Sequence, residues 1–377
     1  MTPTVALIGA NGHGRWHRRR IAELQRSGRA RLVALADTQP IDPDPPIPDG
    51  VPVFTAHREL LAAAHPDVVV ICTPPHTHLP IALDAIDAGC DLLLEKPPVA
   101  SLAAHRTLSA ALNAAGRACQ VGFQALGSVA WARFREAVAG DPPTAIAAVA
   151  SWQRADAYYT RTPWAGRRAV GGRPVIDGAL VNPLAHAVMQ TLATAAAAGA
   201  GRPRTLAVER YRTRAIEVDD TAFARITFDH GADVVVAVTL AGEEFIAGEI
   251  VVRWPAGRAV LEYPTDRLAL PTSAELTPVP GRTDLLTNLL DHRETGAALL
   301  VPLESTRDFT AVLEALTEAD VPLPQLIEEK YLDQHDGVRT IRGINGLVRQ
   351  VAETTHLPSE LGIPWATAPH SRRVPVG

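Results

Sequence analysis

The sequence is short of cysteine, with three in 377 residues. An odd and low number spread over a long chain excludes a disulfide-stapled scaffold and favours a reducing compartment. A basic excess is lacking as well, because 36 Lys and Arg residues stand against 41 Asp and Glu residues, for a formal charge of −5. Such a chain offers no overall positive field for phosphates, so we expect no nucleic-acid partner.

Long hydrophobic runs are also missing. The chain starts without a basic segment, and its first apolar run, Val5–Ile8, is too short for a signal peptide. The Ala-rich stretch 192–201 falls well short of the roughly 20 apolar residues of a membrane span. We therefore expect a cytoplasmic protein with no membrane partner. The 47% share of apolar residues and the length predict two domains with sizeable cores.

The first third of the chain alternates short apolar runs with helix-like stretches. The apolar runs are 5–8, 32–36, 68–72, 92–94 and 119–122, and the helix-like stretches are 15–26, 60–64, 79–88 and 102–115. Buried strands separated by helices are typical of a parallel sheet covered on both faces. Residues 1–124 are therefore predicted to form an α/β domain with a doubly wound parallel sheet of the Rossmann type.

After residue 124 the pattern changes to longer segments that alternate polar and apolar residues. These segments are 146–154, 205–214, 221–229, 233–240, 249–254 and 259–263. Period-two alternation with short turns is typical of antiparallel strands. Residues 125–325 are predicted to form an α+β domain with a large, mostly antiparallel open sheet, a helix near 183–198 and helix again over 285–319. Residues 326–377 are predicted to be a C-terminal extension that has helical pieces, packs on one domain and ends in a disordered segment.

A glycine-rich turn follows the first predicted strand and opens a helix. Its candidate cofactor-binding residues are Gly9, Asn11, Gly12, His13 and Gly14. Glycines let a phosphate approach the backbone at a helix N-terminus, whereas Asn11, in place of the usual second glycine, relies on the tolerance of asparagine for left-handed backbone.

The choice between the two dinucleotides follows from the end of the second strand. Asp37 can accept hydrogen bonds from both ribose hydroxyls. No Arg or Lys follows it before Arg58, so no partner for a 2′-phosphate is evident. The sequence therefore predicts NAD rather than NADP.

Two further motifs carry a family resemblance. The first contains Thr73-Pro-Pro-His-Thr-His78, and the second is Glu95-Lys96-Pro97, which ends the fourth strand. They resemble the signature of the Gfo/Idh/MocA oxidoreductases, which include sugar and cyclitol dehydrogenases, closely over residues 4–125 and loosely over residues 125–325. The resemblance implies a Rossmann domain joined to a second domain whose open sheet forms the oligomer interface. It therefore implies a homo-oligomer that assembles through that sheet.

The same resemblance assigns roles to several side chains. It places Lys96 in the active site, near the nicotinamide and the reacting substrate oxygen, where a cation helps to take the proton of the hydroxyl group. It also implies that Thr73, Pro74, His78 and Glu95 line the cofactor. No metal site is expected at His76 and His78, because this pair has no carboxylate or cysteine nearby.

A second family motif is altered in this sequence. The family usually carries two glycines, then an Asp, with a His four residues later; here Asn182 stands four residues before His186, and Asp177 lies upstream. Either Lys96 carries more of the proton transfer or Asp177 folds back to replace the missing carboxylate. Asn182 is either a substrate contact or the N-cap of the following helix. His186 is either a general base or a satisfied core histidine.

An aromatic and arginine-rich stretch precedes this motif. Its candidate substrate-binding residues are Tyr159, Arg161, Trp164 and Arg167. Aromatic faces pack on sugar C–H groups, and guanidinium groups bind hydroxyl or carboxylate oxygens. A surface loop or a subunit contact is the alternative. If these arginines reach the substrate, an acidic sugar or a phosphorylated polyol is favoured.

These observations together predict an NAD-dependent dehydrogenase with a small sugar-like substrate. It would transfer a hydride from a secondary hydroxyl group of a sugar, a cyclitol or a derivative to nicotinamide. Two alternatives stay open, namely NAD-assisted glycoside cleavage through transient oxidation and a ligand-sensing regulator without catalysis. The presence of Lys96 argues against a regulator, and the missing motif carboxylate argues for one.

Overall fold

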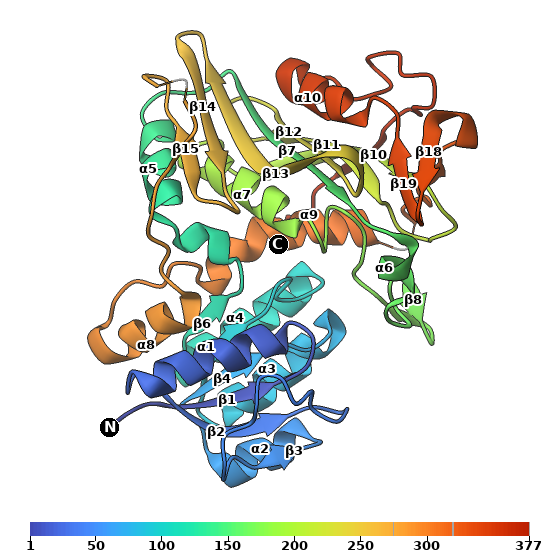
Figure 1. Ribbon diagram of the computed structural model, residues 1–377. Helices are drawn as coiled ribbons and strands as arrows, with labels where there is room; N and C mark the ends of the chain where they lie inside the picture. The colour runs from blue at the N-terminus through green and yellow to red at the C-terminus, as the bar shows by residue number, and fades with distance from the viewer. Residues whose placement is uncertain (274, 319, 377) are drawn as a thin grey trace. The chain divides into compact units, whose positions relative to one another are not determined.

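The computed structural model describes residues 1–273, 275–318 and 320–376. The chain divides into a first unit, Met1–Gln124 with Thr283–Thr310, and a second unit, Ala125–Arg282 with Ala311–Gly377 (Figure 1). These units differ from the domains that the sequence predicts. The sequence predicts residues 283–310 in the second domain and residues 326–377 in a separate extension. Ala319 and Gly377, the ends of the predicted 285–319 helix and of the extension, lie outside the described residues.

The first unit is built on a parallel sheet with strand order β3-β2-β1-β4-β5-β6. Its strands are β1 (Thr4–Ile8), β2 (Arg31–Ala36), β3 (Val53–Phe54), β4 (Val68–Ile71), β5 (Asp91–Leu94) and β6 (Cys119–Val121). Its helices are α1 (Gly14–Arg26), α2 (His57–Ala64), α3 (His78–Asp87), α4 (Leu102–Ala115) and α8 (Leu285–Thr295), with short 3₁₀ turns η1 (Pro75–Thr77) and η3 (Leu303–Thr306). The predicted Rossmann-type sheet is confirmed.

Helix α8 explains why residues 283–310 group with the first unit. It contacts β5 and β6, and it is joined to α1 by ion pairs between Arg20 and Asp284 (3.0 Å) and between Arg29 and Asp291 (2.5 Å). The helix begins at the N-cap Asp284, whose side chain accepts a hydrogen bond from a backbone N–H, and it ends before Gly296 in left-handed conformation. The local sequence therefore determines where α8 begins and ends, whereas the ion pairs with α1 hold it in the first unit.

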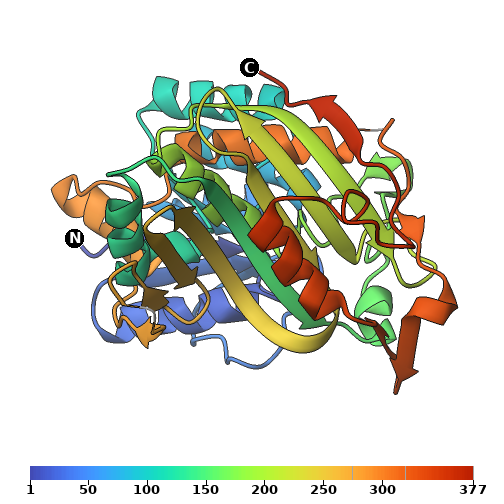
Figure 2. The same cartoon turned by 90° about the horizontal axis from the view of Figure 1, so that it is seen from above.

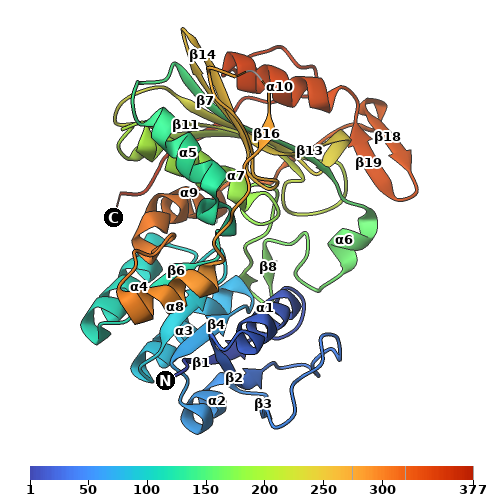
Figure 3. The ribbon, with the colours of Figure 1, turned by 60° about the vertical axis from the view of Figure 1, so that its left-hand side comes forward.

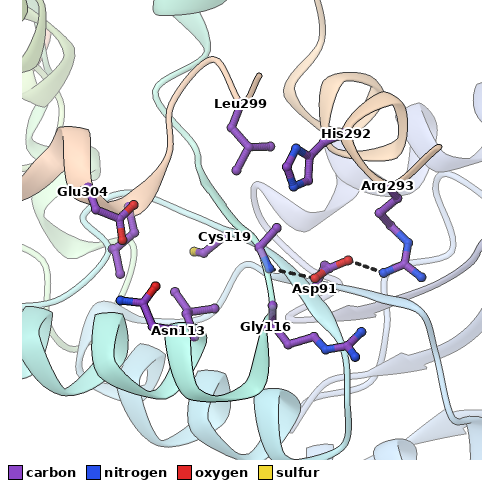
Figure 4. A pocket seen from close by; sticks show the side chains of 12 residues that line it. Asp91, Asn113, Gly116, Cys119, His292, Arg293, Leu299 and Glu304 are labelled. Atoms are coloured by element: carbon purple, nitrogen blue, oxygen red, sulfur yellow. Dashed lines mark hydrogen bonds and ion pairs between the residues drawn. The ribbon is translucent and has the colours of Figure 1, made fainter. Parts of the chain in front are cut away.

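A pocket of about 560 Å³ lies at the amino ends of β5 and β6 (Figure 4). Asp91 points towards Arg293 at one end of it, and Glu304 lies at the other. One carboxylate oxygen of Asp91 accepts a hydrogen bond from the N–H of Ala118 (2.8 Å), and the other pairs with Arg293. Because this pocket lies at the sheet edge opposite the glycine turn and its central charges neutralise each other, we interpret it as structural.

The Asp91–Arg293 pair gives a stability prediction for the first unit. Arg293→Ala leaves the nearly buried Asp91 carboxylate with a single donor, and we expect a loss of about 2–4 kcal/mol in the free energy of unfolding. Arg117→Ala is the control, because Arg117 lines the same pocket but forms no ion pair with a described residue. Hydrogen exchange of the β4 and β5 amides measures both; equal effects of the two substitutions would contradict the prediction.

The second unit is built on a mixed sheet with order β16-β15-β14-β13-β7-β12-β11-β10-β17, with β20 paired to β10. Its strands are β7 (Ala145–Gln153), β10 (Pro203–Arg212), β11 (Thr221–Phe228), β12 (Val234–Thr239), β13 (Ala241–Trp254), β14 (Gly257–Glu262), β15 (Arg267–Ala269), β16 (Thr277–Pro278), β17 (Gln325–Leu326) and β20 (His370–Arg373). Only the β7–β12 and β10–β17 pairs among the described strands of this sheet are parallel. The predicted large, mostly antiparallel sheet is confirmed.

The remaining elements of the second unit are helices and short hairpins. They are α5 (Val129–Val138), α6 (Asp156–Thr160), α7 (Ala185–Ala197), α10 (Ile344–Thr354), η2 (Gln124–Gly127), η4 (Glu329–Tyr331) and the pairs β8 (Ala169–Val170) with β9 (Arg173–Pro174) and β18 (Leu332–His335) with β19 (Val338–Ile341). Helix α9 (Arg307–Thr317) continues the chain from the first unit into the second. Among the described residues, no helix has both the length and the apolar character needed to cross a lipid bilayer.

The C-terminal extension covers one face of this sheet. Figure 2 shows α10 lying across the strands, and Figure 3 shows α7 on the opposite face. The apolar side of α10 has helical spacing and packs on alternate residues of the strands. The cluster includes Ala147, Val149, Tyr211, Phe223, Val235, Ala237, Ile344, Leu347, Val348 and Val351. The face on which the resemblance placed an oligomer interface is thus occupied, in its middle, by the chain itself.

The end of the extension also differs from the expectation of disorder. Residues 370–373 form β20, which pairs with β10 in antiparallel register from Thr205↔Arg373 to Val208↔His370. Arg372 forms ion pairs with Glu318 and with Asp320 (2.9 Å). The prediction of disorder was wrong because a proline- and arginine-containing strand has no local apolar signal; its pairing with β10 stabilises it instead.

Candidate functional site

The glycine turn lies at the carboxyl end of β1 and leads into α1. A Cβ atom at Gly9 would lie 2.3 Å from the carbonyl oxygen of Cys72, and one at Gly14 would lie 2.0 Å from the carbonyl oxygen of Gly9. Both positions therefore require glycine for close packing of the turn. The backbone N–H groups of Gly12 and His13 make no hydrogen bond with a described residue, so two donors are available at the start of α1.

Asp37 braces the glycine turn. Its Oδ2 atom accepts hydrogen bonds from the N–H groups of Ala10 (2.9 Å) and Asn11 (3.1 Å), and its Oδ1 atom accepts one from Gln39 (3.0 Å). A carboxylate offers about four acceptor sites, so three are used and one is left for a ribose hydroxyl. Without a rearrangement, Asp37 can therefore accept a hydrogen bond from one ribose hydroxyl group. The sequence had predicted acceptance from both.

Asn11 holds the loop that follows Asp37. Its side-chain amide donates to the carbonyl of Pro40 (3.1 Å), and its oxygen accepts from the N–H of Asp42 (2.8 Å). Its backbone is not left-handed; Gly9 and Gly12 adopt that conformation instead. The tolerance of asparagine for left-handed backbone is thus not what places Asn11 here.

Arginines of α1 bind the same loop. Arg15 pairs with Asp42 (3.2 Å) and with Asp44 (2.8 Å), and Arg19 pairs with Asp44 (2.7 Å). The cations near Asp37 thus come from α1 rather than from the loop itself, and these two are already paired with carboxylates. The surroundings of Asp37 remain unfavourable for a 2′-phosphate.

The Thr73–His78 segment follows β4, next to the glycine turn. Thr73 lies against Gly9, because a Cβ atom at Gly9 would contact its methyl group at 3.0 Å. His78 is fully buried, with its ring nitrogens 2.9 Å from the carbonyl oxygen of Pro97 and 2.8 Å from that of Thr73. Burial lowers the pKa of His78, so the ring is neutral and donates to one of the two carbonyls at a time.

His78 therefore joins two turns instead of facing a ligand. It connects the Thr73–Pro74 turn to the Glu95–Pro97 turn, and its full burial differs from the expectation that it lines the cofactor. Pro74 is exposed and Thr73 half-buried, so these two stay available at the end of β4. His76 is exposed while His78 is buried, so the pair does not converge on a metal.

Glu95 lies at the centre of a small charged cluster at the end of β5. Its Oε1 atom lies 2.9 Å from His17 Nε2 and 3.5 Å from His13 Nε2, and its Oε2 atom accepts a hydrogen bond from the N–H of Lys96 (3.2 Å). Burial alone would raise the pKa of Glu95, but the two histidines outweigh burial and hold its pKa well below the usual range. His13 thus connects the glycine turn to the turn that carries Lys96.

His13, His17 and Glu95 also lie close enough together to be considered as ligands of a metal ion. Their ligand atoms lie within 4.8 Å of one another. However, His17 Nδ1 is buried without a hydrogen-bond partner among the described residues. A metal-bound histidine almost always donates its other N–H to an acceptor, and His17 has no such acceptor at Nδ1 among the described residues. The hydrogen-bonded cluster fits the surroundings better than a metal centre does.

The cluster predicts the titration of His13. The hydrogen bond to Glu95 raises the pKa of His13 above 6.5, against burial and the nearby charge of Lys96. The stabilisation from this contact is therefore fully present below the unfolded-state pKa and is lost as the pH rises through the raised value. NMR titration of the His13 ring should give a midpoint above 6.5, and Glu95→Gln should bring it down. A midpoint that Glu95→Gln leaves unchanged would contradict the cluster.

In the second unit, Asp177 folds back onto Asn182. The Asn182 amide nitrogen donates to Asp177 Oδ1 (3.0 Å), and the N–H of Gly166 donates to Oδ2 (2.8 Å). Asp177 is 7% exposed and thus holds both the loop at Gly166 and the amide orientation of Asn182.

Helix α7 places His186 in its first turn. The interpretation of Asn182 as the N-cap of this helix was wrong, because α7 begins at Ala185 and the cap position is Leu184, which makes no side-chain capping hydrogen bond. Asn182 lies in the turn before the helix, held by Asp177. His186 is half-buried, on the outer side of a helix whose other residues are mostly buried.

The aromatic stretch forms a pocket and an exposed surface. Tyr159 and Arg167 line a pocket of about 420 Å³ together with Arg214, whose guanidinium lies 4.6 Å from the centre of the Tyr159 ring. Arg167 pairs with Glu217 at 3.3 Å. Arg161 and Trp164 do not line this pocket and stack on each other, 5.1 Å apart. The four predicted substrate residues thus fall into two groups.

Comparison with known proteins supports the Rossmann-type fold of the first unit. Residues 4–123 match the family model described as "Oxidoreductase family, NAD-binding Rossmann fold" (GFO_IDH_MocA). Over these residues the chain is similar to the Gfo/Idh/MocA oxidoreductases. It is 31% identical to an inositol 2-dehydrogenase of Paracoccus denitrificans over 143 residues, which are 37% of this chain and 42% of that protein. It is 35% identical to inositol 2-dehydrogenase 4 of Saccharopolyspora erythraea over 122 residues, or 32% and 36% of the two chains.

These matches span about two fifths of the length of the curated relatives. A solved structure extends the likeness of fold over the second unit. The WlbA dehydrogenase from Bordetella pertussis, in complex with NADH and UDP-GlcNAcA, superposes with a TM-score of 0.69 at 20% identity and covers 86% of this chain and 99% of that one. At this identity the likeness establishes the fold.

Sequence reasoning missed residues that act through distant contacts. His17 lies one helical turn after His13, and the spacing of the two could have indicated that both face the end of β5. Arg214 approaches Tyr159 from another part of the sheet, and nothing in the local sequence marks it.

Proposed function

We propose that this protein is an NAD-dependent dehydrogenase that transfers a hydride between a secondary hydroxyl group of a sugar, a cyclitol or a derivative and nicotinamide. The observation that carries the proposal is the arrangement at the carboxyl edge of the parallel sheet. There the glycine turn and the Glu95–Pro97 turn are joined through His13 and Glu95, with Lys96 adjacent. The family match and the similarity to inositol 2-dehydrogenases support the same reaction class.

The glycine turn fits a dinucleotide. Close packing at Gly9 and Gly14 leaves the backbone accessible, and the N–H groups of Gly12 and His13 have no partner among the described residues. These donors would hold the pyrophosphate at the positive end of α1. Asp37 would accept a hydrogen bond from one ribose hydroxyl, and Thr73 and Pro74 would lie along the dinucleotide. When bound, NAD supplies the hydride acceptor.

NAD is proposed over NADP on electrostatic grounds. A 2′-phosphate near Asp37 would meet the carboxylates of Asp37, Asp42 and Asp44. Arg15 and Arg19, which could compensate, are paired with the last two. Binding of NADP would therefore require breaking ion pairs next to a repelling carboxylate.

Two groups are proposed for the proton transfer. Lys96, as the free amine, would accept the hydroxyl proton as the hydride leaves, and its ammonium form would return it in the reverse direction. His186 is the second candidate. Asn182 is kept as a proposed substrate contact, and Asp177 would fix its amide and contribute the charge that an amide lacks. A small sugar-like molecule is the proposed partner.

Absorbance of NADH tests the reaction directly. The full-length protein is mixed with NAD, and in parallel with NADP, and with a panel of sugars, sugar acids and inositols. Net NADH formation with at least one polyol supports the dehydrogenase and separates it from a glycoside-cleaving enzyme that recycles its cofactor. Calorimetry that detects no binding of either NAD or NADH to folded protein would refute the proposal.

A further inference from the structure

Six side chains of the second unit form a continuous stack that we call the aromatic–arginine ladder. Its members, in order, are Phe245, Trp152, Arg154, Tyr158, Arg161 and Trp164. The rings of Phe245 and Trp152 lie 6.4 Å apart and nearly parallel. Arg154 lies 4.9 Å from Trp152 and 5.2 Å from Tyr158, and Arg161 lies 3.6 Å from Tyr158. Each guanidinium therefore contacts two aromatic rings.

The ladder comes from three chain segments near the end of β7. Trp152 is the last residue but one of the strand, Arg154 follows the strand, and α6 with the turn after it carries the next three members. Phe245, on β13, is 74% exposed, and Arg161 is also exposed. Trp152, Tyr158 and Trp164 are half-buried, so part of each ring stays accessible to solvent. Accessible aromatic surface beside cationic groups is typical of binding sites.

The two arginines of the ladder have no acidic partner. Arg154 donates to the carbonyl of Gln153 (3.0 Å) and Arg161 to that of Tyr158, but neither has a carboxylate within 4.0 Å among the described residues. Nearby acids are used elsewhere: Asp156 pairs with Arg214 (3.1 Å), and Glu217 pairs with Arg167 (3.3 Å). Two guanidinium groups of the ladder, an exposed one at Arg161 and a half-buried one at Arg154, therefore have no neutralising carboxylate among the described residues.

The ladder is continuous in the chain with the residues proposed for catalysis. Trp164 is two residues from Gly166, whose N–H donates to Asp177, and Asp177 accepts a hydrogen bond from Asn182. These contacts all lie within the second unit. The end of the ladder at Trp164 is therefore linked to the Asn182 turn through Gly166 and Asp177.

We propose that the aromatic–arginine ladder is an anion-binding subsite for the substrate, and that the substrate is a sugar or cyclitol that carries a carboxylate or a phosphate group. The inference rests on the proposed dehydrogenase function and adds the class of its substrate. Guanidinium N–H groups bind both anions in the plane of the fork. Contact with the Tyr158 ring already restrains both guanidinium groups, so less side-chain freedom is lost on binding. The ring of Trp164 offers an apolar face to sugar C–H groups.

The test measures binding of three matched probes by calorimetry. These are glucuronate, glucose 6-phosphate and glucose, added to the full-length protein with and without NAD. The variants are Arg154→Gln and Arg161→Gln, which remove the charge and keep a polar side chain. Arg258→Gln is the control, because Arg258 is an exposed arginine of the same sheet and has no ion pair with a described residue. Circular dichroism verifies that the variants are folded.

We expect at least one anionic probe to bind more tightly than glucose, and each ladder variant to weaken it roughly tenfold. Arg258→Gln should leave it unchanged. The preferred anion distinguishes a carboxylate from a phosphate. Arg161→Lys and Arg154→Lys, which keep the charge but lose the fork, should lie in between. In turnover assays the Gln variants should raise KM for the anionic substrate more than they lower kcat.

Different results would contradict the anion-binding subsite and the proposed dehydrogenase function. If both anions bind no more tightly than glucose, or bind the Gln variants as well as the original protein, the ladder is not an anion-binding subsite, whatever the NADH assay gives. If anion binding depends on both arginines but neither NAD binding nor NADH formation is found, the dehydrogenase proposal fails and the subsite stands.

Discussion

Replacing Lys96 by methionine is expected to lower the turnover number by roughly 10²–10⁴-fold and to change the dissociation constant for NAD little. A positioned acid–base group contributes about this factor. The turn that holds Lys96 should survive the substitution, because its anchor is the backbone N–H of Lys96, which donates to Glu95. The groups proposed to hold the pyrophosphate belong to the glycine turn. NADH absorbance gives the turnover number, and calorimetry gives the affinity for NAD.

The composition supplies an unusually clean control. The chain contains two lysines, Lys96 and Lys330, and Lys330 is an exposed residue paired with Glu328 at 3.0 Å. Lys330→Met should leave turnover unchanged. Labelling all lysines with ¹³C or ¹⁵N gives two side-chain signals, so the titration of Lys96 can be followed directly. Full turnover in Lys96→Met would remove Lys96 from the mechanism and leave His186 as the proposed base.

The first unit follows closely from its sequence because its signals are local. The runs at β1, β4 and β5 are apolar on both faces, as strands under two helical layers must be. The turn at Gly9 needs residues without a Cβ atom, and glycine is the visible trace of that need. Strand β3 escaped prediction because two residues beside a proline-rich loop carry no periodicity.

The candidate site could be predicted only where a motif carries it. Glu95 and Lys96 are adjacent in sequence, and the family signature marks them. His17 lies 78 residues from Glu95, and Asp177 contacts both Gly166, which precedes the β8–β9 hairpin, and Asn182. Such contacts depend on the packing of whole elements. The sequence suggested that Asp177 folds back but could not show that it holds the amide of Asn182.

The C-terminal extension is the largest departure from what the sequence and the resemblance implied. Residues Ile344, Leu347, Val348 and Val351 recur at helical spacing, so an amphipathic helix was visible in principle. Its target was not, because the apolar residues that it covers lie on alternate positions of strands more than 100 residues away. An open sheet face was expected as an oligomer interface; the middle of that face is covered by α10.

Val348→Asp is expected to detach α10 and to make the protein self-associate. Val348 is fully buried between α10 and the sheet, and an unpaired charge there costs roughly 3–5 kcal/mol, which is a large part of the stability of a helix held by one apolar side. Detachment would expose Tyr211, Phe223 and Val235 as one apolar patch, and such a patch favours association with a second copy.

Light scattering coupled to size exclusion measures the mass of the variant, and hydrogen exchange of α10 measures its detachment. Gln350→Asp is the control, because Gln350 lies on the exposed side of the same helix. This substitution adds the same charge without burying it. Because α10 already occupies the sheet face, the unaltered chain should not pair through the strands beneath it. Cross-links between β12 residues of two unaltered copies, or a Val348→Asp protein with α10 still protected, would show that the extension does not close this face.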